Sequence, residues 1–338
     1  MRPRWEDVNA RARGLGTRLL EPEALRALAQ LDGPPALGRA LAARGVLPED
    51  TAAATIPGLS IALRRAAGGQ VAILRRWLGA RDAVLAVALD AEDRRSLRAL
   101  IRGAADGAPA EARLAGLIPT PALPERLLRE LAGHASIRTL ATLLIAAGHP
   151  YGPAVLGAAA EAEPDLFRIE LAIARTFAER ALRGSRKGGR FLREYVSRAI
   201  DRDNLRAALI LAGSHGEEPV AQAFIPGGRL TSAEFEAAVA TGNPADAARV
   251  LGATSAGRDV AAILLQHAWA PATLEAELED HLLLALRREA RRDPLGPAPV
   301  LRFLHRLRRQ SVVLGRLLWS VSLDVPASLR LPAGLEAM

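Results

Sequence analysis

FLREYVSRAIDRDNLRAALILAG, the segment from Phe191 to Gly213, has two apolar stripes at helical spacing with a polar cluster between them. Apolar residues recur every three or four positions on both sides of the cluster, as they do in helices that pack one face against a core. The cluster itself consists of Asp201, Asp203, Asn204 and Arg206. The segment therefore predicts helix on both sides of a place where several polar groups need partners.

Two roles are open to this polar cluster. In the first, it is a partner contact that is repeated in each domain. In the second, it is structural: Asp201 or Asp203 caps the start of a new helix, Asn204 satisfies the backbone at a break, and Arg206 pairs with a carboxylate on the preceding turn. We favour the structural role, because a buried polar cluster between apolar stripes usually fixes helix geometry.

Partial copies of the cluster occur elsewhere in the chain. ALDAEDRRSLRALIRG, Ala88–Gly103, places Asp93, Ser96 and Arg98 each 108 positions before Asp201, Asn204 and Arg206. A weaker third copy lies between Leu301 and Leu318, where Arg316 matches but Gln310 and Ser311 stand where carboxylates are expected. The copies therefore do not share one chemical task at this position.

A second pattern repeats at a similar step. An apolar phrase, a glycine or Gly-Pro break and a second apolar phrase follow marker positions at Leu20, Ile118 and Ile225, and Leu331-Pro332 repeats the Ile-Pro pairs of the two later markers. Solenoid repeats are about 20 to 50 residues long, whereas a unit of about a hundred residues can hold its own core. The spacing predicts three tandem homologous helical domains, residues 1–117, 118–224 and 225–338.

Composition supports an all-α fold. Half of the 338 residues are hydrophobic, only 4% are aromatic, and alanine and leucine dominate over the β-branched residues that favour strands. The chain has no cysteine, which excludes disulfides and thiolate metal sites.

The charge pattern does not define a partner. The formal net charge is +8, which raises nucleic acid, anionic lipid or an acidic protein as possible partners. Nearly all the cations are arginine, Lys187 being the only lysine, and they are scattered among carboxylates. We interpret them as solvated helix faces, and the preference for arginine as a coding bias.

Motifs for catalysis, metal binding or membrane insertion are missing from the sequence. The six histidines never pair at the three- or four-residue spacing of helical metal ligands, and His281 beside Glu279 and Asp280 is the nearest approach to a cluster. Gly14 and Gly16 fall inside an expected helix, and SRKGGR, which begins at Ser185, is interpreted as an interhelical loop. No nucleophile elbow, signal peptide or apolar run of about 18 residues is present. We expect a soluble protein that is not an enzyme and needs no metal or cofactor.

Several of these motifs, taken in order, resemble a known family. YVSRAIDRDNLRAALILAG followed by FIPGGRL, Phe224–Leu230, resembles the signature of a component of the V-type and A-type rotary ATPases, the one known as C in bacteria and archaea and d in eukaryotes. VNARARGLGTRLL, which begins at Val8, looks like the opening helix of that family, and the region Leu274–Leu307 looks like its penultimate section. The resemblance runs from about Trp5 to Leu331, although the first and third polar clusters depart from the family pattern.

The resemblance implies a fold and a mechanical role. Its fold is three similar helical domains in a funnel with pseudo-threefold symmetry. Its role is a non-catalytic central-stalk subunit, present in a single copy on the cytoplasmic side of the cell membrane. There it joins the central shaft subunits to the membrane rotor ring subunits and couples ATP chemistry to proton or sodium transport. Membrane association would come only through the ring, and no nucleic acid would be bound. The alternative is a basic helical nucleic-acid-binding or scaffold protein.

Overall fold

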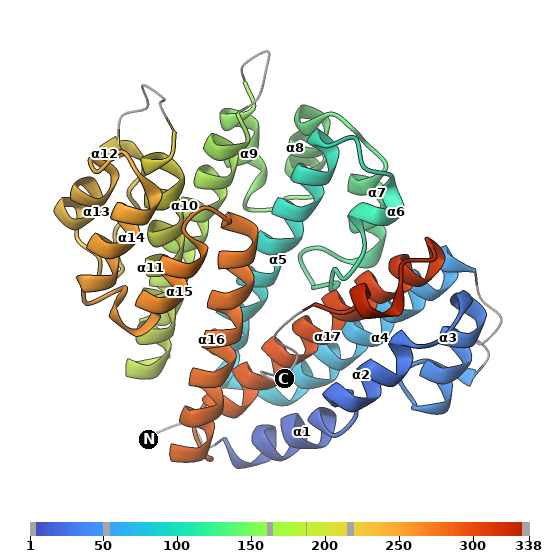
Figure 1. Cartoon of the computed structure of the whole chain (residues 1–338). Helices are drawn as coiled ribbons and strands as arrows, with labels where there is room; N and C mark the ends of the chain where they lie inside the picture. Colours follow the sequence, from blue (N-terminus) through green and yellow to red (C-terminus); the bar gives the residue numbers. More distant parts are fainter. Residues whose placement is uncertain (1–4, 50–54, 161–164, 187, 215–219, 333–338) are drawn as a thin grey trace. The chain divides into compact units, whose positions relative to one another are not determined.

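A computed structural model describes residues 5–49, 55–160, 165–186, 188–214 and 220–332, and all regular structure in them is helical (Figure 1). The predicted all-α class is confirmed. The chain divides into two compact units, Met1–Ile169 with Leu286–Met338 and Glu170–Ala285. Two helices, α10 (Leu166–Ser185) and α16 (Pro271–Arg292), begin in one unit and end in the other. The division into domains 1–117, 118–224 and 225–338 stays a prediction.

The first unit contains three long helices and several short ones. The long helices are α4 (Ile56–Leu78), α5 (Asp82–Ala105) and α17 (Ala298–Ser322). The short ones are α1 (Glu6–Gly16), α2 (Pro22–Ala29), α3 (Gly33–Ala43), α6 (Ala110–Arg113), α7 (Glu125–Ala132), α8 (Ile137–Ala146) and α9 (Gly152–Ala158), with 3-10 turns η2 (Gly79–Arg81) and η4 (Ala327–Leu329).

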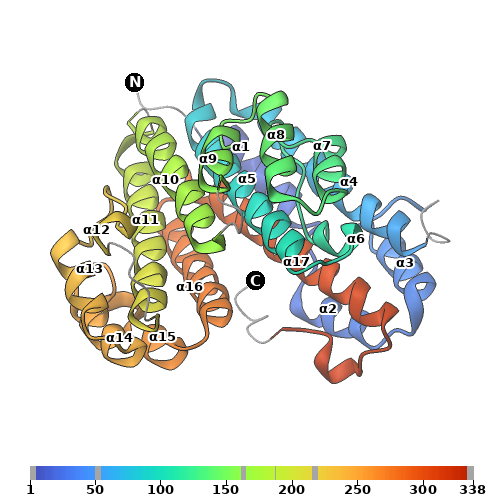
Figure 2. The ribbon, with the colours of Figure 1, turned by 90° about the horizontal axis from the view of Figure 1, so that it is seen from above.

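One long helix organises the second unit. It is α11 (Gly189–Ala212), and the shorter helices α13 (Ser232–Val239) and α14 (Pro244–Ala253) pack against it, as both views of the ribbon show (Figures 1 and 2). The remaining elements are α12 (Val220–Ala223), η3 (Arg258–Val260) and α15 (Ala261–His267). The segment SRKGGR was expected to be an interhelical loop, but Ser185 is the last residue of α10, and Gly189 and Arg190 are the first residues of α11. Only residues 186–188 lie between the two helices, and Lys187 is outside the described residues.

Local sequence signals fix where the short helices of the second unit begin. Thr231 accepts the backbone N–H of Glu234, and the Glu234 carboxylate accepts the Thr231 N–H, which forms a capping box at the start of α13. Asn243 accepts two backbone N–H groups at the start of α14, and Pro244 occupies the first helical position. These caps set the entry angles of two helices that then bury their apolar faces against α11.

The core of the first unit joins helices from opposite ends of the sequence. α17 presents one face at steps of three and four residues, and this face packs on α2, α3 and the start of α4. The participating leucines are fully buried, so each stabilises the fold by about 2 kcal/mol. The residues of this core include Leu25, Leu28, Leu37, Leu41, Leu59, Val313, Leu317 and Val321. The helices after the N-terminus therefore complete their core with the last long helix.

The backbone of residue 116 comes very close to α17. Gly116 has a φ of 73°, and a Cβ on it would lie 2.8 Å from the Val312 Cα. On the helix side, a Cβ on Gly315 would lie 2.6 Å from the Gly116 nitrogen. Only glycine at both positions allows this approach, which holds the turn before Leu117 against α17.

None of the helices built from described residues combines the length and the apolar character needed to cross a membrane.

Candidate functional site

The polar cluster of the second unit lies in the middle of α11 and binds a turn that follows it in the chain. The buried Asp201 accepts the backbone N–H groups of Arg229 at 2.6 Å and Leu230 at 3.0 Å through Oδ1. Its Oδ2 accepts Arg229 Nε at 3.0 Å. Since a charged acceptor strengthens each of these hydrogen bonds, Asp201 fixes the turn to the helix.

Asn204 completes this contact one helical turn further on. Its amide nitrogen donates to the Ile225 carbonyl at 2.8 Å, and its Oδ1 accepts the Ile225 N–H at 2.9 Å. Asn204 is fully buried, and the side chain satisfies both backbone groups of Ile225 as a neighbouring strand would. We call the contact of Asp201 and Asn204 with residues 225–230 the α11 joint.

Glycine in the turn makes the α11 joint possible. A Cβ on Gly228 would lie 2.2 Å from Asp201 Oδ1, so no other residue fits beside that carboxylate without displacing it. Gly227 has a φ of 108°, which side chains rarely tolerate. Gly228 is therefore the steric counterpart of Asp201, and Gly227 provides the backbone conformation of the turn.

The predicted details of the cluster are corrected by these contacts. α11 runs unbroken from Gly189 to Ala212, so Asp201 and Asp203 cap no new helix, and Asn204 sits at no break. Arg206 pairs with Glu170 of α10 at 3.0 Å, and the expected pair with a carboxylate on the preceding turn stays a prediction. The prediction failed because a bend between two apolar stripes and one helix that receives a turn from elsewhere give the same sequence pattern.

A related joint lies on α5. The buried Asp93 accepts the hydroxyl hydrogen of Thr120, and Thr120 Oγ1 accepts the Leu123 N–H at 2.9 Å. His149 lies completely buried nearby, with Nε2 3.9 Å from Asp93 Oδ2. We call the contact of Asp93 with residues 118–123 the α5 joint. It uses a side-chain hydroxyl where the α11 joint uses the backbone N–H groups of Arg229 and Leu230.

Other residues of the α5 copy differ in their surroundings. Arg98 is buried on the same helix. Ser96, the counterpart of Asn204, is buried with no hydrogen-bond partner for its hydroxyl oxygen among the described residues. The amide function that binds the Ile225 backbone in the second unit is therefore not reproduced by Ser96.

The third joint is made by Gln310, which the sequence comparison took for a departure. Gln310 Oε1 accepts the backbone N–H of Leu20 at 2.6 Å, and we call this contact the α17 joint. Arg316 is exposed on the same helix and donates to the Leu329 carbonyl at 3.1 Å. Gln310 follows Asn204 by 106 positions, the same step that separates Ile225 from Leu331. The spacing alone could therefore have identified Gln310 as the counterpart of Asn204.

The three joints share one plan. In each, a polar side chain in the middle of a long helix binds the marker turn that opens a set of short helices, at Ile118–Leu123, Ile225–Leu230 or Leu20. In the first two cases the turn follows its long helix in the chain. In the third, the long helix near the C-terminus binds the turn near the N-terminus.

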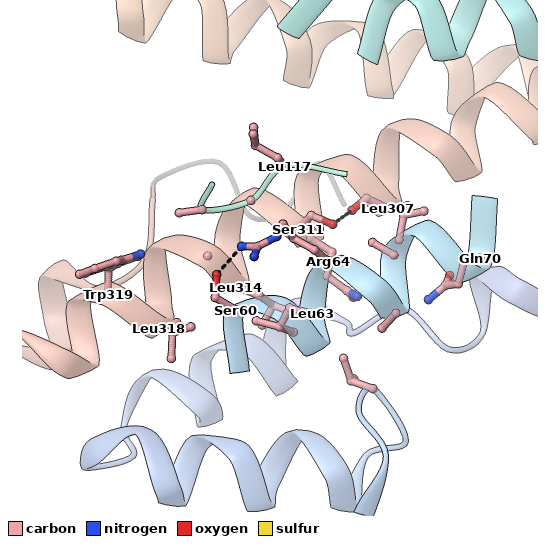
Figure 3. A pocket seen from close by; sticks show the side chains of 17 residues that line it. Ser60, Leu63, Arg64, Gln70, Leu117, Leu307, Ser311, Leu314, Leu318 and Trp319 are labelled. Atoms are coloured by element: carbon pink, nitrogen blue, oxygen red, sulfur yellow. Dashed lines mark hydrogen bonds between the residues drawn. The ribbon is translucent and has the colours of Figure 1, made fainter. Parts of the chain in front are cut away.

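The joints leave little room for a ligand. Beside Gln310 a cavity of about 20 Å³ is lined by α4, α17 and the turn at Leu117 (Figure 3), enough for about one water molecule. Arg64 points into this region, where its guanidinium donates to Ser60 at 2.6 Å and pairs with Glu125 at 3.0 Å. A cavity of about 50 Å³ lies beside Asp201.

Metal binding finds no support at the joints. Among the described residues, which exclude His215, no three or more histidine, aspartate or glutamate side chains gather as a metal site would require. The chemistry of the joints is the fixing of backbone turns by buried acceptors.

Comparison with known proteins places this chain in a family. The family model described as "ATP synthase (C/AC39) subunit" matches residues 8–309. The chain belongs to this family. The C subunits of the V-type ATP synthases from two strains of Thermus thermophilus are each 31% identical to it over 245 residues, which cover 70% of this chain and 68% of the relative. The match of the C/AC39 family includes the whole of α5 and α11, and Gln310 follows its last residue directly.

We predict that substitutions at two equivalent positions of this C/AC39 protein change its stability by different amounts. Asn204→Ala leaves the buried Ile225 N–H and carbonyl unsatisfied, and should lower the free energy of unfolding by about 2–4 kcal/mol. Ser96→Ala removes a buried hydroxyl that has no partner among the described residues, and should stay within about 1 kcal/mol of wild type. Urea denaturation of the full chain measures both. Equal losses in the two variants would contradict the joint.

A second prediction concerns pH and Asp93. Burial raises the pKa of Asp93 above its ordinary value of 3.8, against the opposing effects of His149 and Thr120. The native state therefore holds the proton more tightly than the unfolded chain, and this stabilisation is lost as the pH rises through the raised pKa. Asp93→Asn keeps the neutral form. Its free energy of unfolding, minus that of wild type, should therefore grow with pH above about 4.

Urea titrations at a series of pH values measure this difference. Asp106→Asn removes an exposed carboxyl just after the same helix and controls for the lost charge. A difference between Asp93→Asn and wild type that is constant from about pH 4 to about pH 8 would show that Asp93 is equally ionised in both states.

Proposed function

We propose that this chain is the non-catalytic central-stalk subunit of a V/A-type rotary ATPase. In this proposal it couples the rotor shaft to the membrane rotor ring for ATP-linked proton or sodium transport. The observation that carries the proposal is membership of the C/AC39 family over residues 8–309, together with similarity to the C subunits of V-type ATP synthases.

The three joints support a mechanical role. A part that passes torque between two others must resist bending where its helices meet. Asp201 and Asn204 resist such movement because breaking the α11 joint would leave buried polar groups without partners, at a cost of about 1–3 kcal/mol for each. Gln310 fixes the N-terminal turn to α17 in the same way.

The repeated joints also support the proposed architecture. We infer three homologous domains, residues 1–117, 118–224 and 225–338, arranged with pseudo-threefold symmetry as a funnel. The proposed partners are the central shaft subunits and the membrane rotor ring subunits, with a single copy of this chain in the complex. Its proposed place is the cytoplasmic side of the membrane, held there by the ring alone, with no nucleic acid and no cofactor of its own.

Purification from the native host tests the proposal. An affinity-tagged full chain, isolated from detergent-solubilised membranes, should bring down shaft and ring subunits in fixed proportion, measured by mass spectrometry. A nuclease-treated sample controls for bridging by nucleic acid. If the chain is recovered only with nucleic acid, or is recovered from intact membranes without any partner subunit, the proposal is rejected and the alternative of a basic binding protein is favoured.

Arg206→Ala tests whether the cluster on α11 supports the fold or contacts a partner. Arg206 and Glu170 are both largely buried, so the variant removes a charged partner from a buried carboxylate and should lower the free energy of unfolding by about 3 kcal/mol. Arg193→Ala, exposed on the same helix, should change it by less than about 0.5 kcal/mol. An unchanged melting temperature for Arg206→Ala, with shaft subunits lost from the purification, would instead assign Arg206 to a partner contact.

A further inference from the structure

A cleft of about 410 Å³ in the first unit gathers arginines from three separate segments. Arg13 comes from α1, Arg287 and Arg291 from the end of α16, and Arg302 and Arg306 from the first half of α17. Among the described residues of the lining, Glu21 is the one acidic side chain, which leaves an excess of four positive charges there. The volume is in the range of small-molecule sites.

The arginines of the cleft lie close enough together to repel one another. Arg287 and Arg291, and likewise Arg302 and Arg306, are four residues apart, so each pair shares one helix face, where like charges destabilise a helix. Burial, together with the guanidinium groups of Arg306, Arg287 and Arg291, lowers the pKa of Arg302. Attraction to the C-terminal end of α16 explains Arg291, but Arg302 and Arg306 lie beyond the first turn of α17 and gain nothing from a helix end.

Little within the cleft compensates these cations. Glu21 binds Arg306 at 3.1 Å but is 66% exposed, and the buried Arg306 Nε has no hydrogen-bond partner among the described residues. Within the same described part of the chain, Arg287, Arg291 and Arg302 have no carboxylate within salt-bridge distance. The cleft is therefore a concave surface with unused hydrogen-bond donors.

The walls of the cleft are fixed before any ligand arrives. Asn9 donates to the carbonyls of Pro294 at 3.0 Å and Gly296 at 2.9 Å, and Arg13 donates to Pro294 at 3.2 Å. These bonds tie α1 to the turn that joins α16 to α17. The three helices α1, α16 and α17 supply the arginines of the cleft. A ligand would therefore meet donors that are already positioned, which reduces the ordering cost of binding.

We propose that this cleft binds a phosphate-bearing anion with at least two phosphate charges. Planar guanidinium groups match phosphate oxygens in bidentate pairs, so several arginines that converge on one cleft suit this chemistry. The phosphates come either from a soluble diphosphate-type anion or from an anionic lipid headgroup. The site goes beyond the proposed coupling role and does not depend on it.

Calorimetry and thermal unfolding of the full chain with inorganic pyrophosphate test the site at constant ionic strength. We expect saturable binding and a rise in melting temperature of about 4 °C at a hundred-fold excess over Kd. Arg291→Gln with Arg302→Gln should weaken binding about 100-fold. Because it relieves repulsion, the double variant should also melt no lower than wild type without ligand.

Arg39→Gln with Arg126→Gln is the matched control, since it removes two exposed arginines of the same unit that lie outside the cleft. This variant should bind pyrophosphate as wild type does. Equal responses of the cleft variant and wild type would overturn the site, and so would an equal effect of sodium sulfate at the same ionic strength. Binding of oligoglutamate without binding of pyrophosphate would also overturn it, in favour of a protein carboxylate.

Vesicle sedimentation distinguishes the two sources of phosphate. Retention on phosphatidylcholine vesicles that contain phosphatidic acid, lost in the cleft variant and competed by pyrophosphate, would identify the lipid headgroup. Binding of pyrophosphate with no cleft-dependent retention on these vesicles would identify a soluble anion. Vesicles of phosphatidylcholine alone provide the baseline.

Discussion

A buried polar side chain in the middle of a helix needs a partner, and this requirement determines how the helices of this protein are joined. Asp201 and Asn204 are not needed to cap the backbone of α11, because the helix continues without a break past both residues. They satisfy instead the backbone of a turn that has no helix or strand of its own to bond with. Each side supplies what the other lacks, so neither can be removed without leaving a buried group unsatisfied.

The same requirement explains why the N-terminal helices pack where they do. α2 and α3 are too short to be stable alone, and their leucines need an apolar face. α17 supplies that face, and Gln310 binds the turn at Leu20 that leads into them. The α17 joint therefore connects a helix near the C-terminus to a turn near the N-terminus, whereas each of the other two joints connects a helix to a turn that follows it in the chain.

Much of this was predictable from the sequence, and the limits have physical causes. Helical periodicity gave the all-α class, and the 108-residue step paired Asp93 with Asp201 before any contact was known. Periodicity cannot tell a kinked helix from a straight one that receives a distant turn, so the helix break was wrong. Gln310 was passed over because the comparison sought carboxylates, whereas a neutral amide oxygen accepts an N–H equally well. The partners Thr120 and Gly228 required the structure.

The arginines show a second limit of sequence analysis, because residues that are far apart in the sequence come together in the fold. Arg13 is more than 270 residues from Arg287 in sequence, yet both line one cleft because Asn9 ties α1 to the turn after α16. Scattered basic residues on amphipathic helices are usually solvated, and most of the exposed ones here fit that description. Those of the cleft differ because they converge on a concave surface where, among the described residues, Glu21 is the one carboxylate. Their net charge raises the energy of the empty fold, so an anion that lowers it accounts for the arrangement better than solvation alone.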